Sequence, residues 1–503
     1  MKQTTRRNFL KRSVVGGLAL ALPRWGTASR KVYAAGPNDE IRVAVVGLGG
    51  MDIVGGVGGR GRQLVGHLQK VPGVRIAALC DVDQAVLNHE LQPFRARREP
   101  VAAYVDVRKL LDDNRIDAVA IATPNHWHAL ATIWACQAGK DVYVEKPFSY
   151  NIWEGRQMVA AARKYGRMVQ VGTQSRSSEV LRQAFEYLRS GEIGPIRCAH
   201  AIVYRAREGI GKVAAPTPVP STVDYDLWCG PAPKAPLRRG QLHYEWHWFW
   251  STGNGEIGNN GAHYIDICRW ALGQDKPPLR AISIGGRFGF HDDGETPNTQ
   301  IALLDYQPAP LICEIRALKA PQGPDTLGKF RDLAQGAVID CEGGYFAGNS
   351  TGGAVFDRQG RKMKEFFGDR KPRASEPSPS HVANWVAAIR SRKAADLRAE
   401  ALDGHLSAAC SHMANASYRI GRQASPQAIQ EIIRGSRELS DAFDRCREHL
   451  RSNDVDLGTE QAVAGPWVTL DPAEERFLGE MAGQANEVSR REYRAPFVVP
   501  EVS

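Results

Sequence analysis

The sequence predicts an α/β protein whose first domain is a doubly wound parallel sheet. Three observations predict this class. From Ile41 onward, short runs rich in β-branched residues alternate with longer segments of helical periodicity. Runs such as Ala118–Ala122 are almost continuously apolar, which is typical of strands covered by helices on both faces. The first run leads directly into a long glycine-rich loop, as in the first strand–loop–helix unit of doubly wound sheets.

Six strands separated by helical segments make up the expected first domain, residues 36–172. The clearest helical patterns are His126–Ala138 and Ile152–Tyr165. Gly166 follows the second of them, in the position where glycine commonly ends a helix. The predicted strands are Ile41–Val46, Val74–Cys80, Val101–Tyr104, Asp117–Ala122, Asp141–Glu145 and Met168–Val171.

The rest of the chain is expected to form a second domain, residues 173–425, followed by a helical and irregular extension, residues 426–503. Strand-like runs predict a second sheet, and the helical patterns lie after Ser380. The predicted strands are Arg280–Phe288, Thr299–Tyr306 and Leu311–Leu318, and the helical stretches are Ser380–Arg422 and Pro426–Arg451.

The net charge of +10 arises mainly from the first 35 residues, which contain eight Lys and Arg and no Asp or Glu. Residues 5–11 read Thr-Arg-Arg-Asn-Phe-Leu-Lys, and the apolar run Val14–Leu22 follows them. Small residues, Ala34 and Ala35, then offer a cleavage site. This order resembles a twin-arginine signal peptide. We therefore expect residues 1–35 to direct export to the periplasm and to be removed.

Without this segment the charge no longer indicates a nucleic-acid partner. Removing its eight cations from the 65 Lys and Arg leaves 57 against 55 Asp and Glu, a net charge of about +2. The sequence also contains no run of the roughly 18 consecutive apolar residues that a membrane span needs. We expect neither a nucleic-acid partner nor stable insertion in a membrane after export.

The glycine-rich loop after the first strand is a candidate phosphate-binding loop. Glycine allows a tight turn there and lets backbone N–H groups approach a pyrophosphate at the start of a helix. Asp81 follows the second strand, where a carboxylate accepts hydrogen bonds from a ribose 2′-hydroxyl and repels a 2′-phosphate. This favours NAD over NADP, although NADP stays possible. The candidate glycines are Gly47, Gly49, Gly56, Gly58 and Gly61.

Other polar residues collect where the predicted strands end. Ligands of open α/β sheets bind outside the carboxyl ends of the strands. Asp81, residues 123–128 (Thr-Pro-Asn-His-Trp-His), residues 145–147 (Glu-Lys-Pro) and residues 172–174 (Gly-Thr-Gln) all lie at such ends. We therefore expect them to line one crevice.

These segments resemble a known family. Residues 138–147 (Ala-Gly-Lys-Asp-Val-Tyr-Val-Glu-Lys-Pro), residues 123–128 and residues 258–266 (Gly-Asn-Asn-Gly-Ala-His-Tyr-Ile-Asp) are similar to the motifs of the Gfo/Idh/MocA oxidoreductases, the relatives of glucose–fructose oxidoreductase and inositol dehydrogenase. The resemblance covers roughly residues 40–425. It implies a Rossmann domain followed by an α/β domain with a large, open, mostly antiparallel sheet. That sheet would face the substrate and mediate assembly into a homodimer or homotetramer.

The same resemblance implies roles for individual residues. Lys146 would contact the substrate hydroxyl and aid proton transfer, and His263 would be its acid–base partner. Both are plausible bases, because partial burial lowers the pKa of a lysine and histidine titrates close to neutral pH. The expected cofactor contacts at the strand ends are Thr123, Asn125, His128 and Glu145.

One position departs from the family pattern. Many family dehydrogenases have an aspartate four residues before the motif histidine, whereas this chain has Asn259. An amide can orient a substrate, but it does not exchange a proton near neutral pH. The proton must then pass through His263, Lys146 or another group. Asn259 and Asp266 are expected to contact the substrate.

The second domain also contains a dense aromatic run, His243–Trp250. Aromatic faces bind the C–H faces of sugars, so His247 and Trp248 are candidate substrate contacts, with core packing an equally good interpretation. Arg176 is a further candidate. His243 and His247 are four residues apart, but no third ligand is near, so no metal site is expected. The nine cysteines are scattered without a Cys-x-x-Cys pair and are interpreted as structural.

Together these features predict an exported NAD(P)-dependent oxidoreductase. It would transfer a hydride between the hydroxyl-bearing carbon of a sugar, cyclitol or glycoside and a nicotinamide. Because NAD is made in the cytoplasm and the twin-arginine route carries folded proteins, we expect the cofactor to be tightly bound. One alternative is an NAD-dependent glycosidase that transiently oxidises C3 and eliminates the aglycone. Another is a non-catalytic ligand-binding protein on the same fold.

Overall fold

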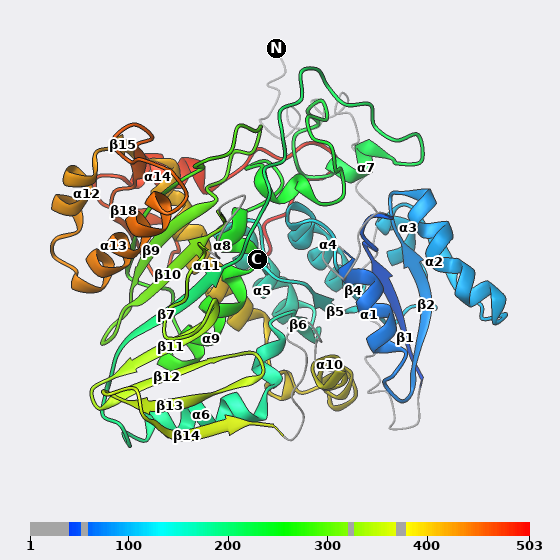
Figure 1. The fold of residues 1–503 in the computed structure, drawn as a ribbon. Helices are drawn as coiled ribbons and strands as arrows, with labels where there is room; N and C mark the ends of the chain where they lie inside the picture. The colour runs from blue at the N-terminus through cyan, green and yellow to red at the C-terminus, as the bar shows by residue number, and fades with distance from the viewer. Residues whose placement is uncertain (1–39, 52–58, 320–325, 369–378) are drawn as a thin grey trace, which may run out of the picture.

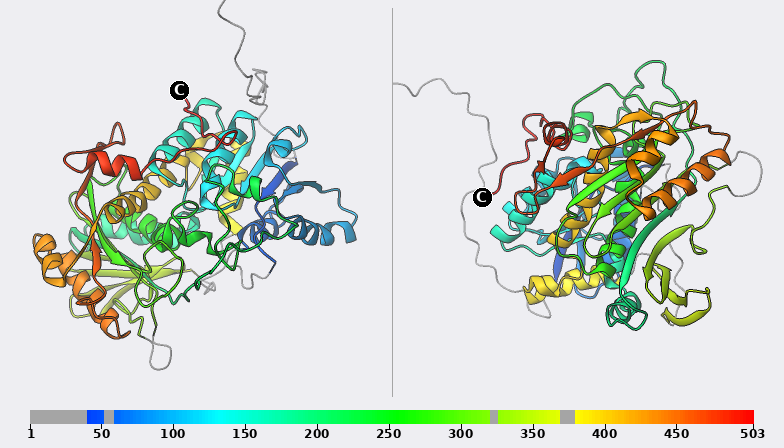
Figure 2. Two further views of the ribbon diagram at one scale, coloured as in Figure 1. Left: turned by 90° about the horizontal axis from the view of Figure 1, so that it is seen from above. Right: turned by 90° about the vertical axis from the view of Figure 1, so that its left-hand side faces the viewer.

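A computed structural model describes residues 40–51, 59–319, 326–368 and 379–503 of the 503-residue chain. It contains a six-stranded sheet and a twelve-stranded sheet, which lie side by side in Figure 1 and in the left view of Figure 2. The predicted signal peptide and two of the candidate loop glycines, Gly56 and Gly58, lie outside the described residues. Among the described helices, none has the length and apolar character to cross a bilayer.

The six-stranded sheet is parallel throughout and has the strand order β3-β2-β1-β4-β5-β6. This is the order of a dinucleotide-binding Rossmann domain, so the predicted fold of the first domain is confirmed. Each strand lies within the predicted range, with boundaries that differ by at most one residue. The strands are β1 (Ile41–Val46), β2 (Val74–Cys80), β3 (Ala102–Tyr104), β4 (Ala118–Ile121), β5 (Asp141–Val144) and β6 (Val169–Val171).

Helices cover both faces of this sheet, and the sheet separates two apolar cores. The two helices that the sequence predicted most clearly are confirmed as α4 (Asn125–Gln137) and α5 (Ile152–Lys164). Late in the chain, α10 (Pro379–Ser391) returns to this domain, where Trp385 is fully buried in the apolar core that also contains Val43 of β1. The other helices are α1 (Arg60–Leu68), α2 (Gln84–Ala96) and α3 (Val107–Leu111).

The twelve-stranded sheet is mostly antiparallel, as predicted, with one parallel pair, β7–β10, among its described pairings. Its path runs β14-β13-β12-β11-β7-β10-β9-β8-β16-β15, and β17 and β18 attach beside β8. The strands are β7 (Ile196–Tyr204), β8 (Arg280–Gly286), β9 (Thr299–Asp305), β10 (Leu311–Arg316), β11 (Gln335–Cys341), β12 (Gly344–Asn349), β13 (Gly352–Asp357), β14 (Lys362–Phe367), β15 (Arg422–Ala424), β16 (Ala462–Ala464), β17 (Val468–Leu470) and β18 (Phe477–Leu478).

Helices on this sheet divide between its two faces. Helices α6, α9 and α11 pack on the face turned toward the Rossmann domain, whereas α12 and α13 lie over β8–β10 on the other face (Figure 2, right). The remaining helices and turns are α6 (Glu179–Arg189), α7 (Tyr225–Cys229), α8 (Gly255–Asn259), α9 (Gly261–Leu272), α11 (Ala401–Arg419), α12 (Pro426–Ile433), α13 (Arg437–Arg451), α14 (Ala482–Val488), η1 (Gln174–Ser177), η2 (Glu245–Trp248) and η3 (Ala394–Asp396).

Both long helical stretches predicted near the C-terminus are interrupted. Residues 380–422 contain α10 and α11, because the Glu400 carboxylate accepts the backbone N–H of Leu402 and starts a new helix. Residues 426–451 contain α12 and α13, and Ser436 caps the second helix in the same way. All nine cysteines, each within the described part of the chain, are buried free thiols.

Candidate active site

A cavity of about 1130 Å³ opens at the carboxyl ends of β1, β2, β4 and β5 and reaches to the second domain. Ligand pockets typically enclose about 300–1,000 Å³, so this one has room for an extended ligand or for two ligands. Ten predicted site residues line it: Gly47, Gly49, Asp81, Thr123, Asn125, Glu145, Lys146, His247, Asn259 and His263.

The loop after β1 requires glycine where it passes the end of β4. Gly47 has a φ of +83°, and a Cβ there would lie 2.8 Å from the backbone nitrogen of Thr123. Gly49 also has a positive φ, +92°. Gly61 packs behind the cavity wall, because a Cβ on it would lie 1.8 Å from the Gly47 carbonyl oxygen. These glycines leave a narrow turn whose backbone can approach a ligand.

Asp81, directly after β2, fits a ribose. One carboxylate oxygen accepts the backbone N–H of Leu48 at 2.6 Å and the other accepts that of Asp83 at 2.9 Å. Each oxygen keeps a lone pair for a hydroxyl donor. Burial raises the pKa of Asp81 to about 6. The Thr123 hydroxyl, which lines the same cavity, is buried without a hydrogen-bond partner among the described residues. These residues, with the glycine turn, fit NAD.

Lys146 carries a partly buried amine at the end of β5. Its Nζ donates hydrogen bonds to Oδ1 of Asn259 at 2.9 Å and to the Asn259 carbonyl oxygen at 3.2 Å. Burial lowers the pKa of Lys146 to about 8, even though the neighbouring Glu145 carboxylate opposes this change. Glu145 itself pairs with Arg60 at 2.7 Å. Burial alone would raise the pKa of Glu145, but the charge and hydrogen bond of Arg60, together with the nearby Lys146 and His263, lower the pKa overall.

His263 lies in the first turn of α9, on the cavity wall. Burial lowers its pKa to about 3, and the nearby Lys146 ammonium adds to the decrease. The imidazole is therefore neutral at neutral pH and can donate or accept one hydrogen bond at each nitrogen. Of these two candidate bases, Lys146 has the pKa that matches proton transfer near neutral pH.

A second ion pair, which no sequence motif indicates, supports the Lys146 side of the cavity. The Arg207 guanidinium donates to both carboxylate oxygens of Glu256 at 2.9 and 2.8 Å and to the Tyr244 hydroxyl at 2.8 Å. Asn259 and Asn260 each donate a side-chain N–H to the same Glu256 carboxylate. Asn259 is thereby fixed, with its oxygen turned toward Lys146. Glu256 precedes the Gly258 motif by only two residues, but nothing in the sequence marks Arg207.

Two residues that were predicted to contact the cofactor, His128 and Asn125, form hydrogen bonds within the protein. His128 is buried behind the wall, where its ring nitrogens contact the carbonyl oxygens of Pro147 at 2.7 Å and Thr123 at 2.9 Å. It thus ties together the segments that follow β4 and β5. Asn125 lines the cavity and donates to Oδ1 of Asn254 at 2.9 Å.

The aromatic run divides between the cavity wall and the core. His247 lines the cavity, stacks on Trp246 and has a pKa lowered by burial to about 3. Trp248 is buried beneath the Arg207 guanidinium, 5.4 Å from it. His243 lines the other end of the cavity, where Nε2 lies 2.9 Å from an oxygen of Asp83.

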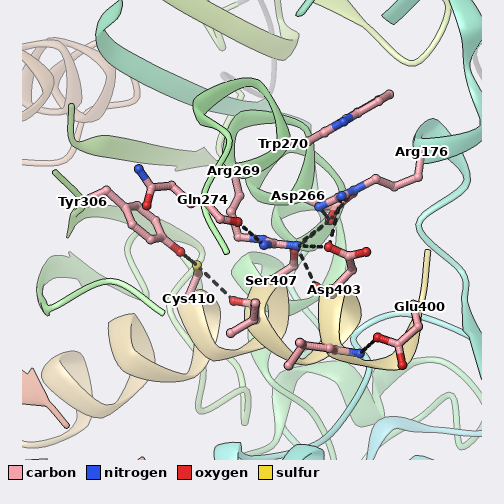
Figure 3. Close-up of polar contacts among 12 residues, drawn as sticks. Arg176, Asp266, Arg269, Trp270, Gln274, Tyr306, Glu400, Asp403, Ser407 and Cys410 are labelled. Carbon is pink, nitrogen blue, oxygen red and sulfur yellow. Dashed lines mark hydrogen bonds and ion pairs between the residues drawn. The ribbon is translucent and has the colours of Figure 1, made fainter. Parts of the chain in front are cut away.

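Arg176 and Asp266 form a buried ion pair with each other, at 2.8 Å, instead of facing the cavity (Figure 3). Asp266 is one helical turn further along α9 than His263 and also accepts a hydrogen bond from Ser407 of α11 at 2.7 Å. Asp403 of α11 contacts both Arg176 and Arg269. The cluster therefore fixes α9, the helix that bears His263, against η1 and α11.

Family models match both domains. Residues 41–173 match the Gfo/Idh/MocA oxidoreductase family, NAD-binding Rossmann fold, and residues 207–302 match the C-terminal α/β domain of the same oxidoreductase family. Curated relatives include glycosyl hydrolase family 109 protein 2 of Shewanella sp. (strain ANA-3), 34% identical over 167 residues, which are 30% of this chain and 35% of the relative. The family 109 protein of Solibacter usitatus is 31% identical over 166 residues, 31% and 36% of the two chains. Each match spans about a third of the relative.

Solved structures share the fold over most of this chain. The WlbA dehydrogenase from Bordetella pertussis, in complex with NADH and UDP-GlcNAcA, has a TM-score of 0.52 and 20% identity, with 75% of this chain and 96% of that chain covered. Aldose–aldose oxidoreductase from Caulobacter crescentus, complexed with glycerol, has a TM-score of 0.50 and 17% identity, with 75% and 97% covered. With its NAD-binding Rossmann domain and its C-terminal α/β domain, the chain belongs to the Gfo/Idh/MocA family of oxidoreductases.

Proposed function

We propose that the protein is an NAD-dependent oxidoreductase that transfers a hydride between a hydroxyl-bearing carbon of a carbohydrate or polyol and a tightly bound nicotinamide. The observation that carries this proposal is Lys146. Its amine lies on the wall of a cavity at the end of a Rossmann sheet, with a pKa lowered by burial to about 8 and a fixed amide oxygen 2.9 Å away. A base of this strength suits the removal of a hydroxyl proton.

Oxidation of a secondary alcohol separates a hydride from a proton. When bound, NAD supplies the hydride acceptor, and Gly47, Gly49 and Asp81 would hold it. The neutral Lys146 amine accepts the hydroxyl proton and becomes an ammonium, while Asn259 accepts a hydrogen bond from that ammonium. The neutral His263 imidazole donates a hydrogen bond to the substrate oxygen. In the reverse reaction Lys146 returns the proton.

Tight binding of NAD is supported by a segment that crosses from the second domain to the Rossmann domain. This strap, residues 213–244, contains α7 and extends over the end of β2 in Figure 1. Val223 pairs with Asp83, the Gln84 N–H donates to the Thr222 carbonyl at 2.9 Å, and His243 contacts Asp83. The strap also meets α4, where the Trp127 indole donates to the Leu227 carbonyl at 3.0 Å.

The direct test is a screen of sugars and polyols against the protein as purified, without added nucleotide. We expect nicotinamide absorbance to change when a substrate is added, and denaturation to release a stoichiometric amount of NAD(H). A protein that yields no nucleotide after gentle purification would contradict tight binding. A protein that binds sugars but turns over none of them with added NAD would favour the non-catalytic alternative.

A second candidate is an NAD-dependent glycosidase. It is favoured by the relatives named glycosyl hydrolase family 109 proteins, which match about a third of this chain. In this chemistry a C3 hydroxyl is oxidised, the C2 proton and the C1 aglycone are eliminated, water adds across the new double bond, and the C3 ketone is reduced again. Release of an aglycone without a net change in nicotinamide would select this candidate over net oxidation.

We further propose that residues 1–35 direct export by the twin-arginine route and that the mature chain is a homodimer or homotetramer. The paired Arg6 and Arg7 before an apolar run support export. Assembly is supported by β14, the last strand in the order of the second sheet. This strand exposes Met363 and Phe367, each 54% accessible.

A further inference from the structure

Arg205 is a further cation that lines the cavity beyond Lys146. Arg205 directly follows β7 in the second domain, and its Nη1 donates to Oδ1 of Asn260 at 3.3 Å. It is partly buried. Burial raises the pKa of the Tyr264 phenol, and the Arg205 guanidinium opposes that rise, so the two groups are close. The neutral polar residues that line this part of the cavity are Asn260, Tyr264, Gln335, Asn349, Ser350 and Thr351.

The Glu256 carboxylate, which also binds Asn260, does not neutralise Arg205. Glu256 accepts hydrogen bonds from Arg207 at both oxygens and one each from Asn259 and Asn260. All of its lone pairs are thereby occupied. Within the described ranges, Arg205 has no Asp or Glu at ion-pair distance.

Among the described residues at this end of the cavity, Arg205 is therefore a cation without an ion-pair partner. Arg60 is paired with Glu145, and Arg207 is paired with Glu256. By contrast, Lys146 and Arg205 donate hydrogen bonds to the neutral side chains of Asn259 and Asn260, respectively. A bound neutral sugar would displace water from Arg205 without replacing it by a negative charge, which is costly. An anion bound here would neutralise the Arg205 charge and accept hydrogen bonds from its planar guanidinium group.

We infer that the substrate is an anionic carbohydrate, whose carboxylate or phosphate binds Arg205 while the hydroxyl to be oxidised binds Lys146. Asn259 and Asn260 are consecutive residues, so one small molecule can contact both cations. Arg205 belongs to the second domain, whereas the loop that would hold the cofactor's pyrophosphate belongs to the first. This inference rests on the proposed function, because it takes the hydroxyl at Lys146 to be the one that is oxidised.

The test compares hexoses, the matching hexuronates and the matching hexose 6-phosphates in the gluco, galacto and manno configurations. For the wild type we expect turnover of an anionic member and a much higher KM for its neutral counterpart. In Arg205→Gln the kcat/KM for the anionic member should fall about 10- to 100-fold, mainly through KM. Preference for uronate over phosphate, or the reverse, identifies the anion. Arg197→Gln, on an exposed arginine at the other end of β7, is the matched control.

Binding provides a readout that does not need turnover. Trp127, Trp228 and Trp246 line the cavity, so quenching of tryptophan fluorescence should report hexuronate or hexose 6-phosphate binding to the NAD-loaded protein. Arg205→Gln should weaken this binding, and Arg205→Lys, which keeps the charge, should restore part of it at an unchanged melting temperature.

Three results would overturn the inference: preference for neutral sugars throughout, an equal loss for neutral and anionic sugars in Arg205→Gln, or no binding of either anion. By contrast, anion binding through Arg205 without any turnover would contradict the proposed oxidoreductase function and leave the anion site in place.

Discussion

At the scale of single residues, the main chemical question is which group takes the substrate proton. Both Lys146 and His263 line the cavity, and the sequence predicts both as candidate bases. The structure separates them, because burial brings the pKa of Lys146 to about 8 and that of His263 to about 3. An imidazole with so low a pKa is a poor proton acceptor at neutral pH. Asn259 then acts as a fixed hydrogen-bond partner for the lysine.

This assignment predicts the pH dependence. Lys146 must be neutral to accept a proton, so kcat/KM for alcohol oxidation should rise with pH and level off above about pH 8. In Asn259→Asp a carboxylate would replace the amide oxygen 2.9 Å from Nζ and stabilise the ammonium. The rising limb should move to higher pH by about 1–3 units, which pH profiles of both proteins will measure. A limb that moves to lower pH would show that the new aspartate is the base.

Asp266 was recognised from its motif, but its position in the structure was not predicted. Sequence position alone puts it near the substrate, whereas the structure buries it against Arg176 and Ser407 (Figure 3). Sequence spacing fixes which residues share a helix, but the packing of α9 on η1 and α11 decides which of them face the cavity. Arg205 and Arg207 were missed because they belong to a loop with no distinguishing sequence pattern.

Asp266→Asn should destabilise the protein strongly. It leaves the Arg176 guanidinium buried, with side-chain exposures of 8% and 1% for the pair, without its main counter-charge. We expect a loss of about 3–5 kcal/mol in the free energy of unfolding, measured by denaturant titration. Asp441→Asn is the matched control, because its partner Arg437 is 89% exposed and the change should be close to zero. Equal stabilities for the two variants would contradict the structural role of Asp266.

At the scale of elements, the Rossmann strands could be predicted because their apolar runs are short, nearly continuous and bounded by glycine or by polar strand ends. Strands β11–β14 were not recognised. Their sequence is interrupted by glycines that the sheet itself requires: a Cβ on Gly336 would lie 2.4 Å from the Gly348 carbonyl oxygen, and one on Gly353 2.5 Å from that of Ala347. Such cross-strand restrictions become visible only when the strands are paired.

The strap is the element that bears most directly on cofactor retention. His243→Ala removes its side-chain contact with Asp83 and should loosen the strap over the end of β2. We expect less NAD(H) to remain bound after extended dialysis, measured by the nucleotide released on denaturation. His89→Ala, on the exposed face of α2, is the control. If both variants keep as much nucleotide as the wild type, the strap does not retain the cofactor.

At the scale of the whole molecule, the proposed export is linked to tight cofactor binding, because NAD is made in the cytoplasm. The first 35 residues supply most of the net charge of +10, as the proposed export signal requires. Replacing Arg6 and Arg7 together by lysine keeps the charge but removes the paired guanidinium groups. In a bacterium with the twin-arginine pathway, cell fractionation should then find the chain in the cytoplasm instead of the periplasm. Lys2→Arg should export normally, and an unchanged distribution of the double variant would contradict the proposed route.

The central claim is that Lys146 accepts the proton while hydride passes to a bound nicotinamide. The most direct test mixes the NAD-loaded protein rapidly with a substrate found in the sugar screen and follows the absorbance of reduced nicotinamide in a single turnover. We predict a fast rise for the wild type and for Lys164→Met, a surface control on α5. In Lys146→Met, with NAD still bound, the rise should be about 10²–10⁴ times slower. An equally fast rise in Lys146→Met would contradict the account.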